Sequence, residues 1–285
     1  MKQLAASYVT ELVRKRHGNR LAELGARMSQ WFLNSYWNER HYDLKTNGEL
    51  LALNILAETY GRGQEVVAFD VGANLGLYAE AILQVMPKAK IHCFELVPSI
   101  QEQLKDRWRG HPAVTVNGFG LSDREVELDV TFYPDSQTEG RIHAMRRAMR
   151  TEMVTGRVCR GDDYLARHGI DRLDFLKIDT EGHELFVLKG FERTLAEGRV
   201  TAIQFEYGTT WLPARTLLSD AYNLLSPLGY KIGRLFPDGV RFKAYDFPQD
   251  EHFRMGNYIA VASEREDLIQ RLAPPRNLHR LSSER

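Results

Sequence analysis

The chain has 285 residues, and its 38 Lys and Arg side chains balance 38 Asp and Glu side chains, so the formal net charge is zero. This balance argues against a protein that coats nucleic acid, because phosphate binding needs a surplus of cations. The two cysteines exclude a disulfide framework and a thiolate zinc site. The chain has no apolar run of about 18 residues and no apolar segment typical of a signal peptide, so we expect a cytoplasmic protein without a membrane span.

Residues 1–60 predict a helical N-terminal cap. Apolar side chains recur at roughly helical spacing between Tyr8 and Tyr36, with charged residues between them. A second helical run, residues 50–60, ends at the glycine-rich stop that begins with Gly61. The main domain is expected to span residues 61–265. Residues 266–285 follow as a tail, whose polar end from Pro274 predicts disorder.

Within the main domain, strands alternate with helices. The predicted strands are 65–71, 90–96, 114–121, 126–133, 171–179, 200–207, 230–236 and 256–262. The predicted helices include 77–86, 184–196 and 217–228. A further helix is expected to begin at a Ser99 cap, with Ile100, Leu104 and Trp108 on its apolar face. Such alternation predicts an α/β fold with a mostly parallel, doubly wound sheet.

A glycine-rich turn follows the first predicted strand, in Asp70-Val71-Gly72-Ala73-Asn74-Leu75-Gly76. Open α/β sheets bind ligands at this end of the strand, and a carboxylate such as Glu95, at the end of the second strand, can accept both hydroxyls of a ribose. The dinucleotide pattern G-x-G-x-x-G is broken at Asn74 and at Leu77. This departure disfavours a nicotinamide cofactor. A turn that merely joins strand to helix is the alternative without any ligand.

The third predicted strand ends in Gly120-Leu121-Ser122-Asp123. This corner lies at the ligand-binding edge of the predicted sheet, so Ser122 is a candidate hydrogen-bonding partner of a bound base. A plain Ser-Asp turn explains the same residues equally well.

An acidic cluster follows the strand at residues 171–179, in the sequence Asp179-Thr180-Glu181-Gly182-His183-Glu184. Thr180 and Glu184 suit the start of the next helix. Asp179 and His183 are candidate bases for removing a hydroxyl proton. Glu206 ends the neighbouring strand, so Asp179, His183 and Glu206 are expected to converge. The same residues also suit a divalent cation, although their spacing is weak support for one.

Residues 139–160 form a basic insert within a neutral chain. Their arginines are Arg141, Arg146, Arg147, Arg150, Arg157 and Arg160, opposed by Glu139 and Glu152. Arginine forks match phosphate and carboxylate oxygens, so an anion clamp or lid over residues 135–160 is one interpretation. A solvated loop is the other. RNA binding is disfavoured, because no interleaved aromatic residues accompany the arginines.

Taken in order, DVGANLG, FELVPS, GLSD and LDFLKIDTEGHE resemble the FkbM family of S-adenosylmethionine-dependent methyltransferases. The segment from Asp43 to Glu49, with Asn47-Gly48-Glu49, is also similar. The resemblance covers roughly residues 43–262 and implies a Rossmann-like class I methyltransferase fold. By position, it assigns cofactor contacts to Asp70, Gly72, Asn74, Gly76, Glu95 and Ser122, with Asn47 and Glu49 added from the preceding segment. It places Asp179, Glu181 and His183 by the reacting centre.

These observations predict an O-methyltransferase that uses S-adenosylmethionine and acts on a sugar, a glycan or glycolipid precursor, or a natural product. The acceptor is expected to be a small molecule or glycan, and the insert suggests an anionic one. A divalent metal and a homodimer both stay open. A catalytically inactive, cofactor-binding partner subunit is the alternative from another class, and a nicotinamide-dependent oxidoreductase is the weaker enzymatic alternative.

Overall fold

The computed structural model describes residues 10–11, 13–16, 18–133, 139–141 and 150–275. The chain divides into two compact units, Met1–His41 and Tyr42–Arg285. The predicted boundary lay at residue 60. The helix α3 (Glu49–Tyr60) belongs to the larger unit. Its Leu53 and Leu56 are fully buried in a hydrophobic core of that unit.

The smaller unit contains helix α2 (Arg20–Tyr36). The side chain of Asn19 caps its first turn by accepting the amide N–H of Leu21 at 2.9 Å. No residue of α2 is buried. Among the described residues, no helix is long and apolar enough to cross a membrane.

The larger unit is built on a main sheet with strand order β11-β10-β12-β9-β8-β1-β2-β3. Its strands are β1 (Val67–Val71), β2 (Lys90–Phe94), β3 (Val114–Asn117), β8 (Leu173–Ile178), β9 (Val200–Tyr207), β10 (Tyr230–Phe236), β11 (Gly239–Phe242) and β12 (Gly256–Ala262). Strands β9, β8, β1, β2 and β3 run parallel to one another. Strand β12 is antiparallel to both β9 and β10, and β11 is antiparallel to β10. The predicted mostly parallel, doubly wound sheet is confirmed.

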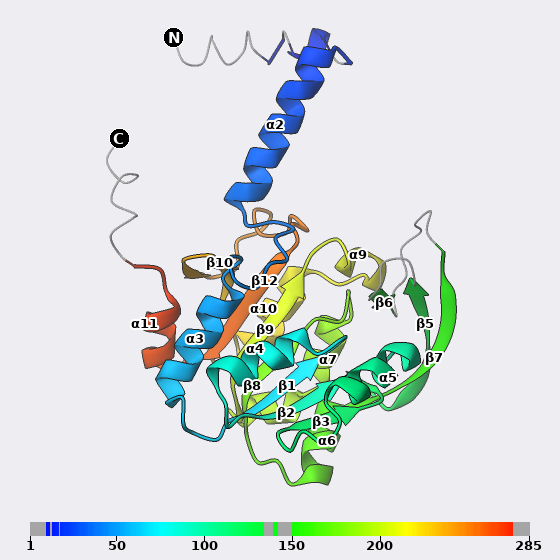
Figure 1. Ribbon diagram of the computed structural model, residues 1–285. Helices are drawn as coiled ribbons and strands as arrows, with labels where there is room; N and C mark the ends of the chain where they lie inside the picture. The colour runs from blue at the N-terminus through cyan, green and yellow to red at the C-terminus, as the bar shows by residue number, and fades with distance from the viewer. Residues whose placement is uncertain (1–9, 12, 17, 134–138, 142–149, 276–285) are drawn as a thin grey trace. The chain divides into compact units, whose positions relative to one another are not determined.

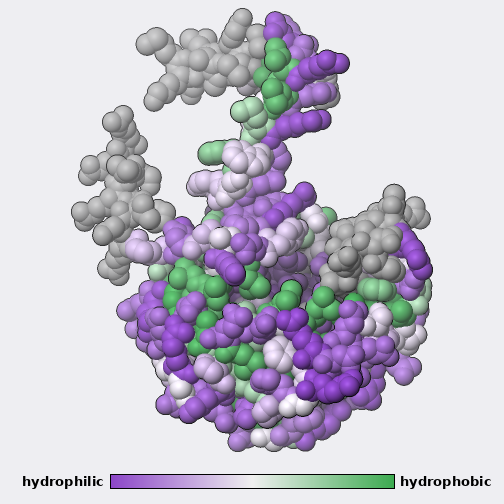
Figure 2. Space-filling model, viewed as in Figure 1, coloured by the Kyte–Doolittle hydropathy of each residue, from purple (hydrophilic) through white to green (hydrophobic). Residues whose placement is uncertain are grey.

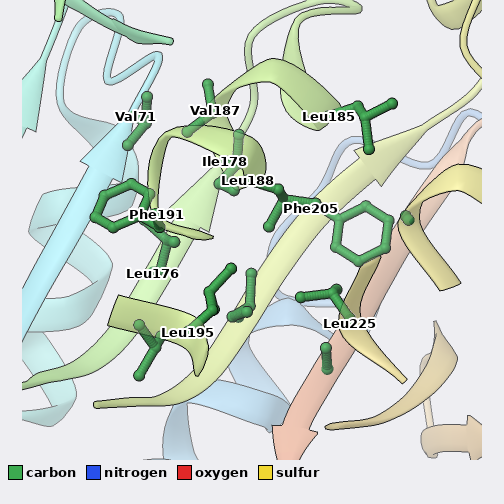
Figure 3. Close-up of a cluster of buried hydrophobic side chains, with 14 of the residues drawn as sticks. Val71, Leu176, Ile178, Leu185, Val187, Leu188, Phe191, Leu195, Phe205 and Leu225 are labelled. Carbon is green, nitrogen blue, oxygen red and sulfur yellow. The ribbon is translucent and has the colours of Figure 1, made fainter. Parts of the chain in front are cut away.

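Helices cover both faces of this sheet (Figure 1). The helices α3, α4 (Leu77–Val85), α5 (Pro98–Arg107) and α11 (Glu266–Leu272) contribute to one core. The helices α6 (Gly161–His168), α7 (Glu184–Gly190), α8 (Glu192–Ala196) and α10 (Leu218–Leu225) contribute to the other. Figure 3 shows this second core, where strand residues such as Ile178 and Phe205 lie among Leu188 and Phe191 of the helical layer. Side chains alternate along each strand, so one strand supplies both cores.

A second sheet has the strand order β4-β7-β5-β6. Its strands are β4 (Gly120–Ser122), β5 (Val126–Tyr133), β6 (Glu139–Arg141) and β7 (Glu152–Arg160). The prediction of one strand over 114–121 was wrong, because the chain leaves the main sheet after β3 and enters this second sheet at β4. Part of the basic insert forms regular structure that was not predicted, since β7 pairs with β5 from Glu152 to Val158.

Several element boundaries differ from the prediction. Helix α5 begins at Pro98 after Val97, so Ser99 is not its cap. The helix predicted over 184–196 divides at Phe191 into α7 and α8. The elements α6, β11, α11 and α9 (Trp211–Ala214) were not predicted, because each is short. Helix α11 lies in the expected tail and is fixed by burial of Leu268 and Leu272, while residues 276–285 lie outside the described chain.

Candidate active site

The glycine-rich turn joins β1 to α4 through three left-handed residues, Gly72 (φ 82°), Asn74 (φ 50°) and Gly76 (φ 76°). A Cβ on Gly72 would overlap the main-chain carbonyl of Asp179, and one on Gly76 would overlap the indole of Trp108. Glycine is therefore required at both positions by backbone conformation and by space. The turn thus packs the end of β1 directly against the end of β8.

Asp70 lies on β1 and is 2% exposed. Burial raises the pKa of its carboxyl group to about 7, helped by the nearby carboxylates of Asp179 and Glu95 and opposed by Lys177. Its Oδ2 atom is buried and accepts no hydrogen bond from the described residues. A buried acceptor without a donor is costly unless a ligand supplies one. This site fits the cationic methionine end of S-adenosylmethionine.

Glu95 follows β2 and joins two loops at the same sheet edge. Its Oε2 accepts the amide N–H of Asn74 at 2.9 Å, and its Oε1 accepts that of Val97 at 2.8 Å. Burial raises the pKa of its carboxyl group. Each carboxylate oxygen can accept more than one hydrogen bond, so a role toward ribose hydroxyls stays a prediction.

An acidic cluster lies at the ends of β8 and β9. Asp179, Glu181 and Glu206 each present one carboxylate oxygen, and these atoms lie within 4.8 Å of one another. The pKa of Glu206 is raised well above its usual value, first by burial and then by Asp179 and Glu181. The structure thus brings Asp179 and Glu206 together and adds Glu181, and the group can share a proton or hold a cation.

His183 is not part of the acidic cluster. The residue is 4% exposed, its Nε2 lies 2.9 Å from the Ser122 hydroxyl, and its ring stacks on Phe186 with centroids 4.6 Å apart. The left-handed residues Glu181 (φ 56°) and Gly182 (φ 108°) turn the chain between Asp179 and His183. After that turn the imidazole lies beside Ser122 of β4 and outside the group of carboxylate oxygens within 4.8 Å of one another, so a catalytic role for His183 stays a prediction.

Lys177 is a central residue that the sequence analysis did not single out. It is 2% exposed, and its Nζ donates to Asp179 Oδ2 at 2.9 Å while lying 5.1 Å from the centroid of the Tyr78 ring. Burial lowers its pKa, but the carboxylates of Asp179, Glu49 and Asp70 outweigh that effect and raise it. A lysine inside an apolar strand was the available signal.

Asn47 and Glu49 reach the site from the start of α3. The Asn47 side chain donates to Glu49 Oε1, and Glu49 Oε2 accepts Gln204 Nε2, both at 2.6 Å. Gln204 Oε1 in turn accepts the Tyr78 hydroxyl at 2.8 Å. These residues form a buried polar network beside Lys177, and Gln204 and Tyr78 are further members that sequence reasoning missed.

The basic insert is described only in part. Arg150 pairs with Glu152 at 2.7 Å, Arg157 lies over the ring of Phe119, and Arg160 donates to the Asp123 carbonyl at 3.1 Å. The side chain of Arg141 and the whole of Arg146 and Arg147 lie outside the described residues. The anion clamp therefore stays a prediction.

Glu184 organises the loop that carries the acidic cluster. Its buried carboxylate accepts the amide N–H of Thr180 at 2.8 Å and that of Gly182 at 3.0 Å, together with the Thr180 hydroxyl at 3.1 Å. We expect Glu184→Ala to lower the free energy of unfolding by about 3 kcal/mol, because the mutation leaves buried donors unpaired. Urea denaturation measures this loss. An equal loss in Glu192→Ala, which removes an exposed carboxylate, would contradict the assignment.

Comparison with known proteins identifies the family of this chain. Residues 70–232, more than half of the chain, match the family described as the methyltransferase FkbM domain. The AMB antimetabolite synthetase AmbE of Pseudomonas aeruginosa is 30% identical over 163 residues, which cover 45% of this chain and 8% of that protein. The chain thus spans a small part of AmbE.

Two other relatives match over most of their length. The hexuronic acid methyltransferase AglP of Haloferax volcanii is 27% identical over 198 residues, covering 69% of this chain and 77% of that protein. The 31-O-demethyl-FK506 methyltransferase FkbM of Streptomyces tacrolimicus is 28% identical over 214 residues, covering 65% and 77%. The extent of the family match, which runs from Asp70 on β1 to Ile232 on β10, decides the assignment: the chain belongs to the FkbM methyltransferase family.

Proposed function

We propose that this protein transfers the methyl group of S-adenosylmethionine to a hydroxyl of a sugar or natural-product acceptor. The observation that carries the proposal is the buried Asp70 carboxylate, whose Oδ2 has no donor among the described residues. It interacts electrostatically with Lys177, Asp179 and Glu95. The names of the relatives AglP and FkbM, a hexuronic acid methyltransferase and a 31-O-demethyl-FK506 methyltransferase, support an oxygen acceptor.

In this proposal some residues bind the cofactor and others act on the acceptor. Bound S-adenosylmethionine supplies the electrophilic methyl group. Asp70 stabilises the positive charge of its methionine end, and Glu95 accepts from the ribose hydroxyls. Asp179 takes the proton of the acceptor hydroxyl, and its side chain is 42% exposed and therefore within reach of an incoming molecule. Lys177 holds one Asp179 oxygen in place, and most of the acceleration comes from such positioning.

A divalent cation held by Asp179, Glu181 and Glu206 is a second way to lower the cost of removing that proton. The convergence of the three carboxylates favours it. Treatment with EDTA followed by Mg²⁺ or Mn²⁺ separates the two routes. If methyl transfer survives EDTA, Asp179 alone removes the proton. If activity is lost with EDTA and recovered with the ion, and equilibrium dialysis shows that the protein takes up the ion, the cation takes part in removing the proton.

The acceptor class is inferred from charge and from relatives. An anionic sugar such as a hexuronic acid suits both the arginines of the insert and the name of AglP. We expect methyl-labelled S-adenosylmethionine to label an acidic sugar more than its neutral counterpart. Equal labelling of the two sugars would contradict the anionic acceptor. A protein that binds the cofactor and labels no acceptor in a broad panel would instead match the inactive partner subunit.

A further inference from the structure

Helix α2 of the smaller unit carries an apolar face that none of the described residues of that unit covers. The face comprises side chains at helical spacing that are between 53% and 77% exposed, namely Leu21, Leu24, Met28, Trp31, Phe32 and Tyr36. Its opposite face carries Glu23, Gln30 and Asn34. Figure 2 shows hydrophobic and strongly hydrophilic residues side by side on this segment. Exposed aromatic and aliphatic side chains in one stripe mark an interaction surface.

The charge around this apolar face is positive. Residues 10–36 contain Arg14, Lys15, Arg16, Arg20 and Arg27 against Glu11 and Glu23, a local charge of +3 in a chain that is neutral overall. Lys15 pairs with Glu11 at 2.6 Å. Among the described residues, none of the four arginines forms an ion pair.

Two of these cations lie at the border of the apolar face. Arg20 and Arg27 stand four residues before Leu24 and Trp31, so each lies one turn away on the same side of the helix. Long basic side chains beside an apolar stripe can keep the stripe buried while their charged ends reach anionic groups. This arrangement is typical of helices that lie in the plane of a membrane surface.

We propose that α2 binds an anionic lipid surface, with its apolar face among the acyl chains and its arginines at the phosphate groups. Seventeen residues with three charged side chains do not suit a spanning helix. A second copy of the helix fits less well, because each copy would bring the same net positive charge and only Glu23 within α2 could offset it. The proposal does not depend on the methyl-transfer reaction.

Co-sedimentation of the full chain with lipid vesicles tests the proposal. We expect binding to vesicles of phosphatidylcholine with phosphatidylglycerol, little binding to phosphatidylcholine alone, and release at high salt. Met28→Glu and Asn34→Glu add the same charge on opposite faces of α2. Met28→Glu is expected to bind at least about tenfold more weakly than Asn34→Glu, because only the former places a charge among acyl chains. Arg20→Gln is expected to weaken binding to the anionic vesicles by about fivefold.

Four results would overturn the proposal. These are no binding to the anionic vesicles, equal binding by Met28→Glu and Asn34→Glu, a change of oligomeric state confined to Met28→Glu, and a melting temperature lowered by Met28→Glu alone. The third, measured by light scattering, would assign the face to a second copy. The fourth would assign it to the larger unit of the same chain.

Discussion

Asp70→Asn is expected to weaken binding of S-adenosylmethionine by about a hundredfold or more. The substitution keeps the shape of the side chain but removes the negative charge of a buried carboxylate whose Oδ2 has no donor among the described residues. Loss of one partner from a desolvated charge pair costs about 2–5 kcal/mol, and 1.4 kcal/mol corresponds to tenfold in affinity. Isothermal titration calorimetry measures the effect, with Asp129→Asn on the exposed face of β5 as the control.

The pH dependence of cofactor binding gives an independent check on Asp70. Burial raises its pKa to about 7, so the ionised form that attracts a cation is a minority at pH 6 and the majority at pH 8. Affinity for S-adenosylmethionine is therefore expected to rise about tenfold over this interval and to level off above it. The same rise in Asp70→Asn would contradict the assignment.

The stability of the cofactor-free protein should show the opposite trend. A carboxyl group with a raised folded-state pKa binds more protons in the folded state, so its contribution to stability falls as the pH rises from about 4 to about 7. Asp70→Asn is therefore expected to unfold at a higher urea concentration than the wild type at pH 8. This advantage should shrink toward pH 5.

Asp179→Asn is expected to lower kcat by about a hundredfold to ten-thousandfold while cofactor affinity changes by less than about tenfold. The amide still fits beside Lys177, whose Nζ lies 2.9 Å from the Asp179 carboxylate, but it cannot accept the hydroxyl proton. Stopped-time assays with labelled cofactor measure kcat, and calorimetry measures the affinity.

His183→Gln is the matched comparison for Asp179→Asn. Glutamine can keep a hydrogen bond to Ser122, so turnover is expected to stay within about tenfold of the wild type. A large loss of kcat in His183→Gln together with normal turnover in Asp179→Asn would reverse the assignment of the base.

The main sheet was predictable because its strands are short apolar runs. The segments between them have apolar residues at helical spacing, and several end at glycines. The convergence of Asp179 with Glu206 followed from one rule, since the carboxyl ends of parallel strands meet at one edge of the sheet. The same rule placed Asp70 and Glu95 together. These inferences need only the order and direction of neighbouring strands.

Other features depended on contacts that no local pattern contains. The chain leaves the main sheet between β3 and β4 because β4 pairs with β7, a strand about 30 residues further on. His183 lies beside Ser122 because Glu181 and Gly182 are left-handed, and sequence spacing does not reveal that turn. Lys177 gains its importance from Glu49, Asp70 and Asp179, which arrive from three different segments.

Calorimetry of the wild-type chain with S-adenosylhomocysteine and with NAD tests the central claim most directly. The site at the ends of β1 and β2 should bind one S-adenosylhomocysteine per chain, with an affinity that falls in Glu95→Gln, and should not bind NAD. No heat of binding with S-adenosylhomocysteine, or binding of NAD that is lost in Glu95→Gln, would contradict the proposed cofactor site.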